Sequence, residues 1–296
     1  MSANDNEARP RPSAKEMAKT MAKNIEAWSG KDKGDENFPV ASLLIAKPLR
    51  ARVHAYYAYA RNADDISDSP SLSPEEKLNR LDTMEAVLTG AKDTGSPSAT
   101  RLRQSMQESG VPNIHARELL TAFRQDVTKT RYESWAELMG YCRYSAAPVG
   151  RYVLDVHGES HDTWPPSDAL CASLQVLNHL QDCAKDLRDL DRCYVPQDWL
   201  HAQGLSTDDI ARSETLPGLR IVFDKMLEET DKLNILAAEL PRRVKSRRLR
   251  IETAIICALA RRLTTLLKSG DPLASRVKLS KLDVLAATLK GLRYAA

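Results

Sequence analysis

The sequence predicts an all-α protein built as a single domain. Apolar residues recur at helical spacing along most of the chain, and no alternating run of useful length indicates a strand. Glycine is scarce, with 12 of 296 residues, which argues against a β-rich barrel or a glycine-looped nucleotide fold. Hydrophobic residues make up 42% of the chain, enough to bury a substantial core.

The chain divides into a polar lead over residues 1–35 and one helical domain over residues 36–296. Residues 1–13 are typical of disorder, and Met17, Met21, Ile25 and Trp28 then recur at the spacing of one short helix. In the domain, periodicity predicts helices over 47–67, 75–91, 98–109, 113–127, 134–157, 167–190, 217–240, 244–268 and 280–292.

Turn-forming residues separate these helices. Ser73 is expected to cap the helix that begins at Pro74, with Glu76 returning the second bond of a capping box. Further breaks are predicted at 94–97, 164–166, 216–218 and 270–272, where Gly or Pro stands beside polar or small residues.

Composition also narrows the function. The formal net charge is only +3 and aromatic residues make up 5%, so neither charge nor stacking platforms indicate a nucleic-acid binder. The five cysteines form no CxxC pair and are expected to be reduced core thiols. No signal peptide or membrane span is predicted. We therefore expect a cytoplasmic protein.

The first acidic segment ends the predicted helix 47–67. With Val53 at zero on a helical wheel, Asp64 lies at about 20° and Asp68 at about 60°, on the buried stripe rather than the solvent face. Like charges one turn apart repel each other, so a cation should compensate them. A fraying acidic helix end is the alternative, since the Asp64-Asp65-x-x-Asp68 pattern is short.

The second acidic segment lies in the predicted helix 167–190. Measured from Gln175, one face carries Asn178, Asp182 and Asp186 within about 60°, with His179 beside them. Short oxygen-bearing side chains at one-turn intervals form a stack of hard ligands suited to Mg²⁺. The alternative is an ordinary solvated face.

Together the two segments predict a diphosphate site. Facing aspartate-rich helices could hold several Mg²⁺ ions that share phosphate oxygens with a substrate. Such ions would neutralise the departing pyrophosphate when an allylic or cyclopropylcarbinyl diphosphate ionises. An apolar helical bundle around a central cavity would house the hydrocarbon.

These motifs resemble those of the squalene/phytoene synthase family. Arg61-x-x-Asp64-Asp65-x-x-Asp68 and Asn178-x-x-x-Asp182-x-x-x-Asp186 are similar to the two signature motifs of that family, in the same order. Residues 37–44 resemble its entry segment, and residues 141–150 its central substrate helix. The resemblance implies a bundle of the isoprenoid synthase type and Mg²⁺ as cofactor.

Within the family, residues 37–44, 125–132, 145–150 and 155–160 resemble the hydroxysqualene synthases of bacterial hopanoid biosynthesis. The resemblance implies conversion of presqualene diphosphate and water to hydroxysqualene and pyrophosphate. Gln181 stands where family members usually carry Arg, and Ala147 and Pro148 stand where Gly and Thr are usual. The loss of one cation near the diphosphate, at Gln181, puts condensation of two prenyl diphosphates in doubt. A presqualene diphosphate or phytoene synthase, which carries out that condensation, is the alternative within the family. A non-catalytic helical assembly factor is the alternative from another class.

The predicted metal ligands are Asp64, Asp68, Asn178, Asp182 and Asp186. By resemblance, the substrate contacts are expected to be Ser42, Arg61, Asp65, Tyr141, Ala146, Gly150, Gln175, Arg188, Arg192 and Tyr194. Of these, Arg61, Tyr141 and Gln175 are expected to take part in catalysis.

Several of these residues have a structural alternative. Asp65 lies at about 120° on the wheel and could instead be a solvent-facing or indirectly acting carboxylate. Arg61 could form a structural salt bridge, and Tyr141 could be core rather than a cation–π partner. Ala146 and Gly150 would leave room for a prenyl chain or allow close helix packing.

Two further features concern structure and partners. His179 is expected to be a structural histidine rather than a base. Six of the nine residues from Arg242 to Arg250 are basic, which predicts a solvated helix face or peripheral attachment to anionic lipid at the inner membrane surface. We also expect association with the enzyme that makes presqualene diphosphate.

Overall fold

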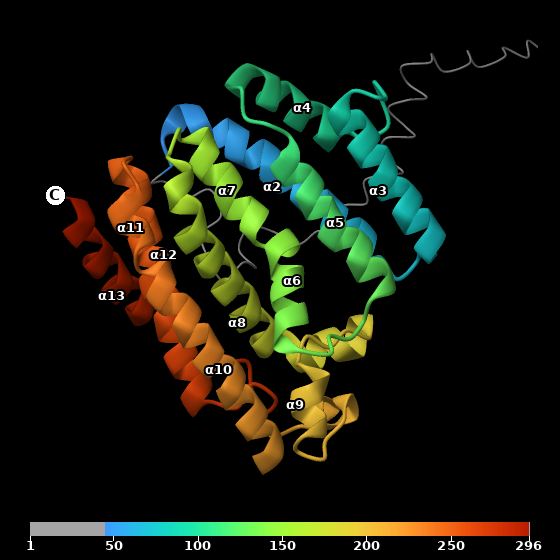
Figure 1. Cartoon of the computed structure of the whole chain (residues 1–296), viewed down its shortest axis with the longest axis vertical. Coiled ribbons are helices and arrows are strands. Elements are labelled where there is room, and N and C mark those ends of the chain that lie inside the picture. The colour runs from blue at the N-terminus through green and yellow to red at the C-terminus, as the bar shows by residue number, and fades with distance from the viewer. Residues whose placement is uncertain (1–44, 296) are drawn as a thin grey trace, which may run out of the picture.

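The computed structural model describes residues 45–295, and this part of the chain is helical without a strand, as the sequence predicts (Figure 1). One isolated bridge pairs Arg131 with Cys193. The α-helices are α2 (Lys47–Asp68), α3 (Pro74–Thr89), α4 (Pro97–Ser109), α5 (Ile114–Thr128), α6 (Trp135–Ser145), α7 (Ala147–Val156), α8 (Trp164–Leu190), α9 (Gln197–His201), α10 (Pro217–Ala237), α11 (Leu240–Arg243), α12 (Arg247–Ser269) and α13 (Lys281–Leu292). Three short 3₁₀ turns cover His161–Thr163, Thr207–Ala211 and Arg293–Ala295. The polar lead, its predicted helix and Ser42 lie outside the described residues.

Helix starts follow local capping chemistry. Ser73 accepts a hydrogen bond from the backbone N–H of Glu76 at 3.2 Å, as predicted. The capping box is not completed, because the Glu76 carboxylate accepts instead from Arg80 at 2.8 Å. The helix α13 does carry a full box, formed by Ser280 and Asp283.

The prediction of one continuous helix over 134–157 is wrong. The segment forms two helices, α6 and α7, which are separated at Ala146, where the backbone (φ −125°, ψ −48°) leaves the helical region. Pro148 explains the break, since it has no N–H to donate and its ring would clash with the carbonyl one turn earlier. Proline at the first turn then suits the start of α7. The break predicted at residues 164–166 is also wrong, since Pro165 and Pro166 lie inside the first turn of α8. Proline is tolerated there because the first N–H groups of a helix have no partner within the helix.

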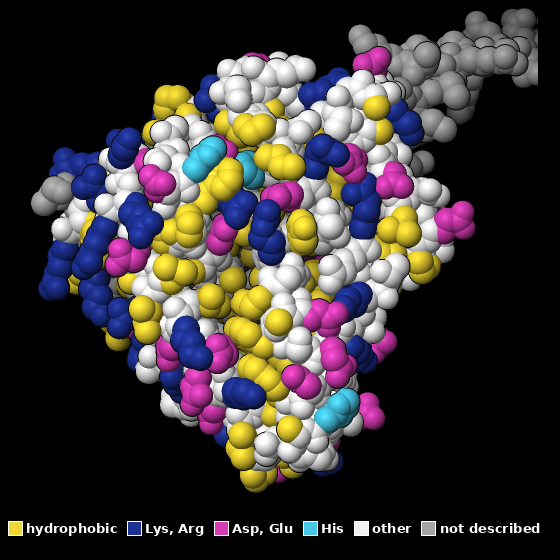
Figure 2. All heavy atoms as spheres, viewed as in Figure 1, with side chains coloured by type: hydrophobic (Ala, Val, Ile, Leu, Met, Phe, Trp, Pro, Cys, Tyr) yellow, Lys and Arg dark blue, Asp and Glu magenta, His cyan; other side chains and the backbone are white. Residues whose placement is uncertain are grey.

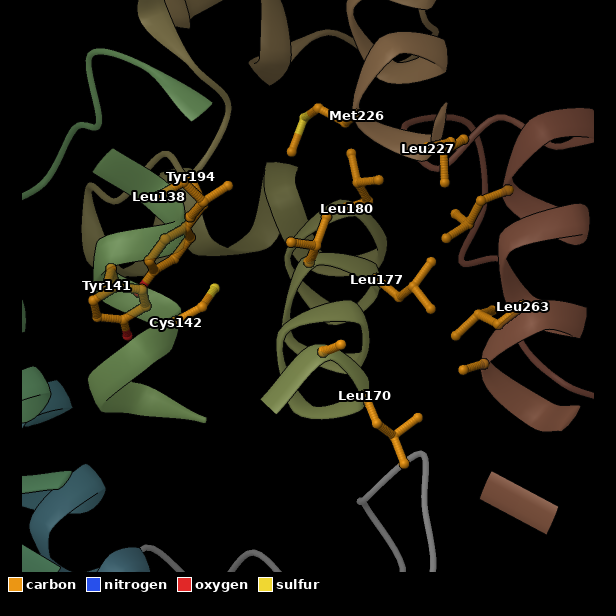
Figure 3. Packing of buried hydrophobic residues seen from close by; sticks show 14 of the residues in the cluster. Leu138, Tyr141, Cys142, Leu170, Leu177, Leu180, Tyr194, Met226, Leu227 and Leu263 are labelled. Atoms are coloured by element: carbon orange, nitrogen blue, oxygen red, sulfur yellow. The ribbon is translucent and has the colours of Figure 1, made fainter. Parts of the chain in front are cut away.

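Two groups of buried side chains form the core. One joins α2, α3, α4 and α5, and the other surrounds α8. Figure 3 shows Leu177 and Leu180 of α8 between α6 on one side and α10 and α12 on the other. Four of the five cysteines are buried in the protein and all five are free thiols, as expected.

Among the described residues, no helix combines the length and apolar character needed to cross a membrane.

Candidate active site

A cavity of about 380 Å³ lies between the two core groups. Its wall is largely apolar and is built by α2, α5, α7, α8 and α12, as in Tyr56, Phe123, Val153, Leu170 and Ile256. Arg61 and Asp64 of α2 belong to the same wall. The cavity therefore joins a space suited to a hydrocarbon with a charged end formed by the first acidic motif.

Arg61 lies between two carboxylates of its own helix. Its guanidinium contacts Asp64 at 3.0 Å and Asp65 at 2.9 Å. Asp65 is buried, with a side chain only 5% exposed, so the solvent-facing alternative for this residue is wrong. The wheel placed Asp65 off the apolar stripe, but neighbouring helices cover that side of α2. Arg61 thus compensates the repulsion that the spacing of the aspartates predicts.

Asp64 lies at the cavity wall with its side chain 34% exposed. Dense protein around the carboxyl, followed by the nearby negative charge of Asp68, raises its pKa to about 8, and Arg61 opposes this shift. A cation bound beside Asp64 would offset both effects, because it stabilises the ionised carboxylate. The Asp64 carboxyl is therefore in an environment that favours binding of a positive ion.

Arg192 brings the segment after α8 to the end of α2. Its guanidinium contacts Asp68 at 2.6 Å and donates to the backbone oxygens of Ser67 at 3.3 Å and Asp126 at 3.0 Å. The residue is only 6% exposed. A buried guanidinium that uses three acceptors from two helices holds those helices in a fixed relation.

Tyr141 donates its hydroxyl proton to Asp126 at 2.9 Å in the buried region next to Arg192. Burial raises the pKa of Asp126 to about 7, while Arg192 and the Tyr141 hydrogen bond lower it. The ring of Tyr141 lies 5.5 Å from that of Tyr194, which stacks on His179 at 3.5 Å. Aromatic contacts therefore connect α6 with α8 and with the segment after it.

The acidic face of α8 is half-buried, not freely solvated. Gln175 Nε2 lies 3.1 Å from Nε2 of His179, and Nδ1 of His179 lies 3.9 Å from Asp186. Asp182 pairs with Arg276 at 3.5 Å. Burial lowers the pKa of His179 and so disfavours the charged imidazolium, while the carboxylate of Asp186 opposes this shift.

The donor set is suited to Mg²⁺ by its chemistry. Among residues 45–295, no three His, Cys, Asp or Glu side chains converge closely enough to hold an ion by themselves. Magnesium commonly takes only one or two carboxylates and completes its shell with water and substrate phosphate. The oxygens of Asp64 and Asp68 on α2, and of Asp182 and Asp186 on α8, fit that manner of binding.

The other predicted substrate contacts differ in their position relative to the cavity. Arg188 is on the surface, where its side chain is 70% exposed and pairs with Asp189 at 2.9 Å. Ala146 is buried at the junction of α6 and α7. Gly150 lines the cavity and also packs closely, since a Cβ there would lie 2.5 Å from Ser167 Oγ and 2.7 Å from Cys171 Sγ. Close helix packing at Gly150 is thus confirmed, and room for a prenyl chain stays a prediction.

Sequence reasoning missed Asp126 and Glu252. Asp126 is 6% exposed at the centre of the Tyr141–Arg192 contacts, and Glu252 is 5% exposed and lines the cavity. Each continues an apolar stripe at helical spacing, Asp126 after Leu119 and Ala122, and Glu252 after Leu249. An acidic residue on the apolar face was the signal that identified Asp64, and it would have identified these two as well.

Comparisons with known proteins agree with this geometry. The squalene/phytoene synthase family model matches residues 31–283. The hydroxysqualene synthase of Rhodopseudomonas palustris is 46% identical over 268 residues, 90% of this chain and 91% of that protein. The hydroxysqualene synthase of Sinorhizobium fredii is 47% identical over 251 residues, 85% of this chain and 86% of that protein. Among solved structures, a squalene synthase from Alicyclobacillus acidocaldarius matches with a TM-score of 0.70 and 28% identity, covering 86% of this chain and 92% of that one.

Proposed function

The chain belongs to the squalene/phytoene synthase family of enzymes, and we propose that it converts presqualene diphosphate and water to hydroxysqualene and pyrophosphate with Mg²⁺. The observation that carries the proposal is the placement of Arg61 and Asp64 at one part of a largely apolar cavity. A substrate with one diphosphate and a long hydrocarbon has the matching distribution of charge. The names of relatives that cover about nine-tenths of the chain support the same reaction.

In this proposal, acidic and amide side chains bind the metal, and two arginines position the acidic side chains. Asp64, Asp68, Asn178, Asp182 and Asp186 would hold Mg²⁺. The ion, when bound, neutralises charge on the leaving pyrophosphate. Arg61 holds the Asp64 carboxylate in place and adds positive charge near the diphosphate. Arg192 positions Asp68 from the other side.

The cavity wall would govern the fate of the substrate after ionisation. Breaking the carbon–oxygen bond releases pyrophosphate and leaves a carbocation, which water captures with loss of a proton to give the alcohol. The apolar wall excludes bulk water and so limits premature capture. Aromatic rings of Tyr57 and Phe123 in that wall can stabilise the cation through their faces. Tyr141 is not among the residues that line the cavity, and we propose that its hydroxyl, which donates to Asp126, holds that carboxyl in position.

Labelled water provides the direct test. Incubation of the full chain with presqualene diphosphate, Mg²⁺ and ¹⁸O-water should place the label in a C30 alcohol and release pyrophosphate without NADPH. Asp64→Asn is the matched inactive variant, and Asp189→Asn, on the exposed side of α8, is the control that should stay active. Reduction to squalene, or consumption of farnesyl diphosphate alone, would overturn the proposal in favour of a condensing or reducing family member.

The assembly-factor alternative gives a different result in the same experiment. A non-catalytic protein would show no turnover, and the Asp64→Asn variant would keep full biological activity. We further propose that the enzyme receives its substrate from the enzyme that makes it, either through the membrane surface or by direct association. Co-purification of the two enzymes, with and without detergent, separates these routes.

A further inference from the structure

The C-terminal helix α13 has an unusual orientation, with its leucines outward. Leu282, Leu285, Leu289 and Leu292 are 77%, 56%, 59% and 51% exposed. Their spacing of three, four and three residues places them within about 80° on one side of the helix. Isolated exposed leucines are ordinary, but a continuous stripe of them marks an interaction surface.

The side of α13 that packs on the protein is made of small residues. Ala287 and Gly291 are the buried residues of this helix. A Cβ at Gly291 would lie 2.4 Å from Ile255 and 3.1 Å from the Ile251 carbonyl oxygen of α12, so only glycine allows this approach. Arg262 of α12 also pairs with Asp283 at 2.6 Å. The helix is thus fixed on α12 in the orientation that turns its leucines outward.

Basic residues outnumber acidic ones in α13 and beside it in the sequence. From residue 277 to the end of the chain there are four basic residues, namely Lys278, Lys281, Lys290 and Arg293, and one acidic residue, Asp283. The single acidic residue is neutralised by Arg262. Figure 2 shows Lys and Arg side chains gathered on the side of the molecule where Figure 1 places α11, α12 and α13.

We propose that the leucine stripe and basic residues of α13 form a docking surface for an anionic lipid bilayer. Exposed apolar side chains between cations match the boundary between acyl chains and negatively charged headgroups. This inference goes beyond the proposed reaction and stands on surface chemistry alone.

A second copy of the chain fits this surface less well. A twofold contact would place each basic patch against itself, and like charges would repel across the interface. The helix also spans only Lys281–Leu292, too short for a stable coiled-coil seam. An anionic bilayer has the charge opposite to that of the basic residues, and binding to it does not require a longer helix.

The position of α13 relative to the cavity adds a functional consequence. Leu249, Thr253 and Ile256 of α12 line the cavity, whereas Ile251, Ile255 and Arg262 of the same helix contact α13. The helices α12 and α13 therefore lie between the cavity and the docking surface. Docking would bring a cavity suited to hydrocarbon within about two helix diameters of the bilayer, on the order of 20 Å.

Vesicle sedimentation of the full chain tests the proposal. Wild type should bind vesicles that mix phosphatidylglycerol with phosphatidylcholine, and bind pure phosphatidylcholine or high-salt samples more weakly. The variant Leu285→Ser/Leu289→Ser should lower the partition coefficient at least about tenfold. The matched control is Ile221→Ser/Ile235→Ser on α10, two aliphatic residues that are 56% and 74% exposed, and it should bind as wild type does.

Two outcomes would overturn the docking surface. One is equal vesicle binding by the α13 variant and wild type. The other is a wild-type dimer in sedimentation velocity that the α13 variant dissolves, without vesicle binding by either protein. Turnover of detergent-dispersed substrate should be unchanged in the α13 variant, so failure of docking and failure of the proposed reaction are distinguishable.

Discussion

Arg192 contacts Asp68 at 2.6 Å and so joins two residues that are 124 positions apart in the chain. Asp68 ends α2, and Arg192 follows the end of α8. Both are part of the acidic motifs or close to them, and the same guanidinium also donates to the backbone oxygen of Asp126. This ion pair therefore ties the end of the first motif helix to the segment that follows the second.

Replacing Arg192 should damage both stability and turnover. Arg192→Gln leaves Asp68 without its buried partner, which should lower the free energy of unfolding by about 3–5 kcal/mol. Urea unfolding measures this loss, and kcat/KM should fall with it because the motifs lose their register. Arg188→Gln, four residues earlier and exposed, is the control and should change stability by less than about 0.5 kcal/mol. Equal effects of the two substitutions would contradict the bridging role.

Asp64→Asn should separate activity from stability. Removal of a carboxylate that is crowded by protein and by Asp68 relieves repulsion, so without metal the variant should be more stable by about 0.5–2 kcal/mol. Product formation should fall by at least about a hundredfold, because the ligand nearest the cavity loses its charge. Thermal unfolding and a pyrophosphate-release assay measure the two effects. A destabilised variant would show that Asp64 serves the fold.

Gly150→Ala should be destabilising by about 1–3 kcal/mol. The added methyl group would meet Ser167 and Cys171 of α8 at 2.5 and 2.7 Å, where α7 and α8 pack closely. Gly140→Ala is the matched control in α6, because no atom outside the adjacent residues and the backbone of its own helix lies within 4 Å of its Cβ position. That control should be stabilised by about 0.4–1 kcal/mol through the unfolded state. Chemical denaturation measures the unfolding free energy of both variants. Opposite changes would indicate a steric clash at Gly150, and equal changes would indicate a general effect of the glycine-to-alanine substitution.

Asp126 should give stability a specific pH dependence. Burial raises its pKa from 3.8 to about 7 in the folded protein, with Asp68 adding and Arg192 opposing. The folded state therefore holds this proton more tightly than the unfolded state does. The resulting stabilisation is complete below about pH 4 and is lost as the pH rises through about 7.

The measurement is the difference in unfolding free energy between wild type and Asp126→Asn as a function of pH. Because asparagine does not titrate, the variant should gain relative to wild type between about pH 4 and 7. A pH-independent difference would show that Asp126 is ionised in the fold throughout this range.

Most of the helices could be predicted from the sequence, because helical periodicity and capping depend on neighbouring residues. Ser73 accepts from the N–H of Glu76 as its spacing indicates. The break at Ala146 was also encoded locally, in Pro148, but the apolar pattern continues across it and concealed it. Helical spacing alone places the Asp64 carboxylate on the inner face of its helix, and the residue lies in the cavity wall.

The partners of the buried charges were not predictable in the same way. The sequence by itself determined the helical fold, the helix faces that carry aspartates and the family to which the motifs belong, because each depends on spacing within one segment. Only the tertiary structure decided that Arg192 contacts Asp68, that Tyr141 donates to Asp126 and that α13 turns its leucines outward. Each of these depends on the distance and rotation between helices far apart in the chain, which side-chain packing sets and local periodicity does not encode.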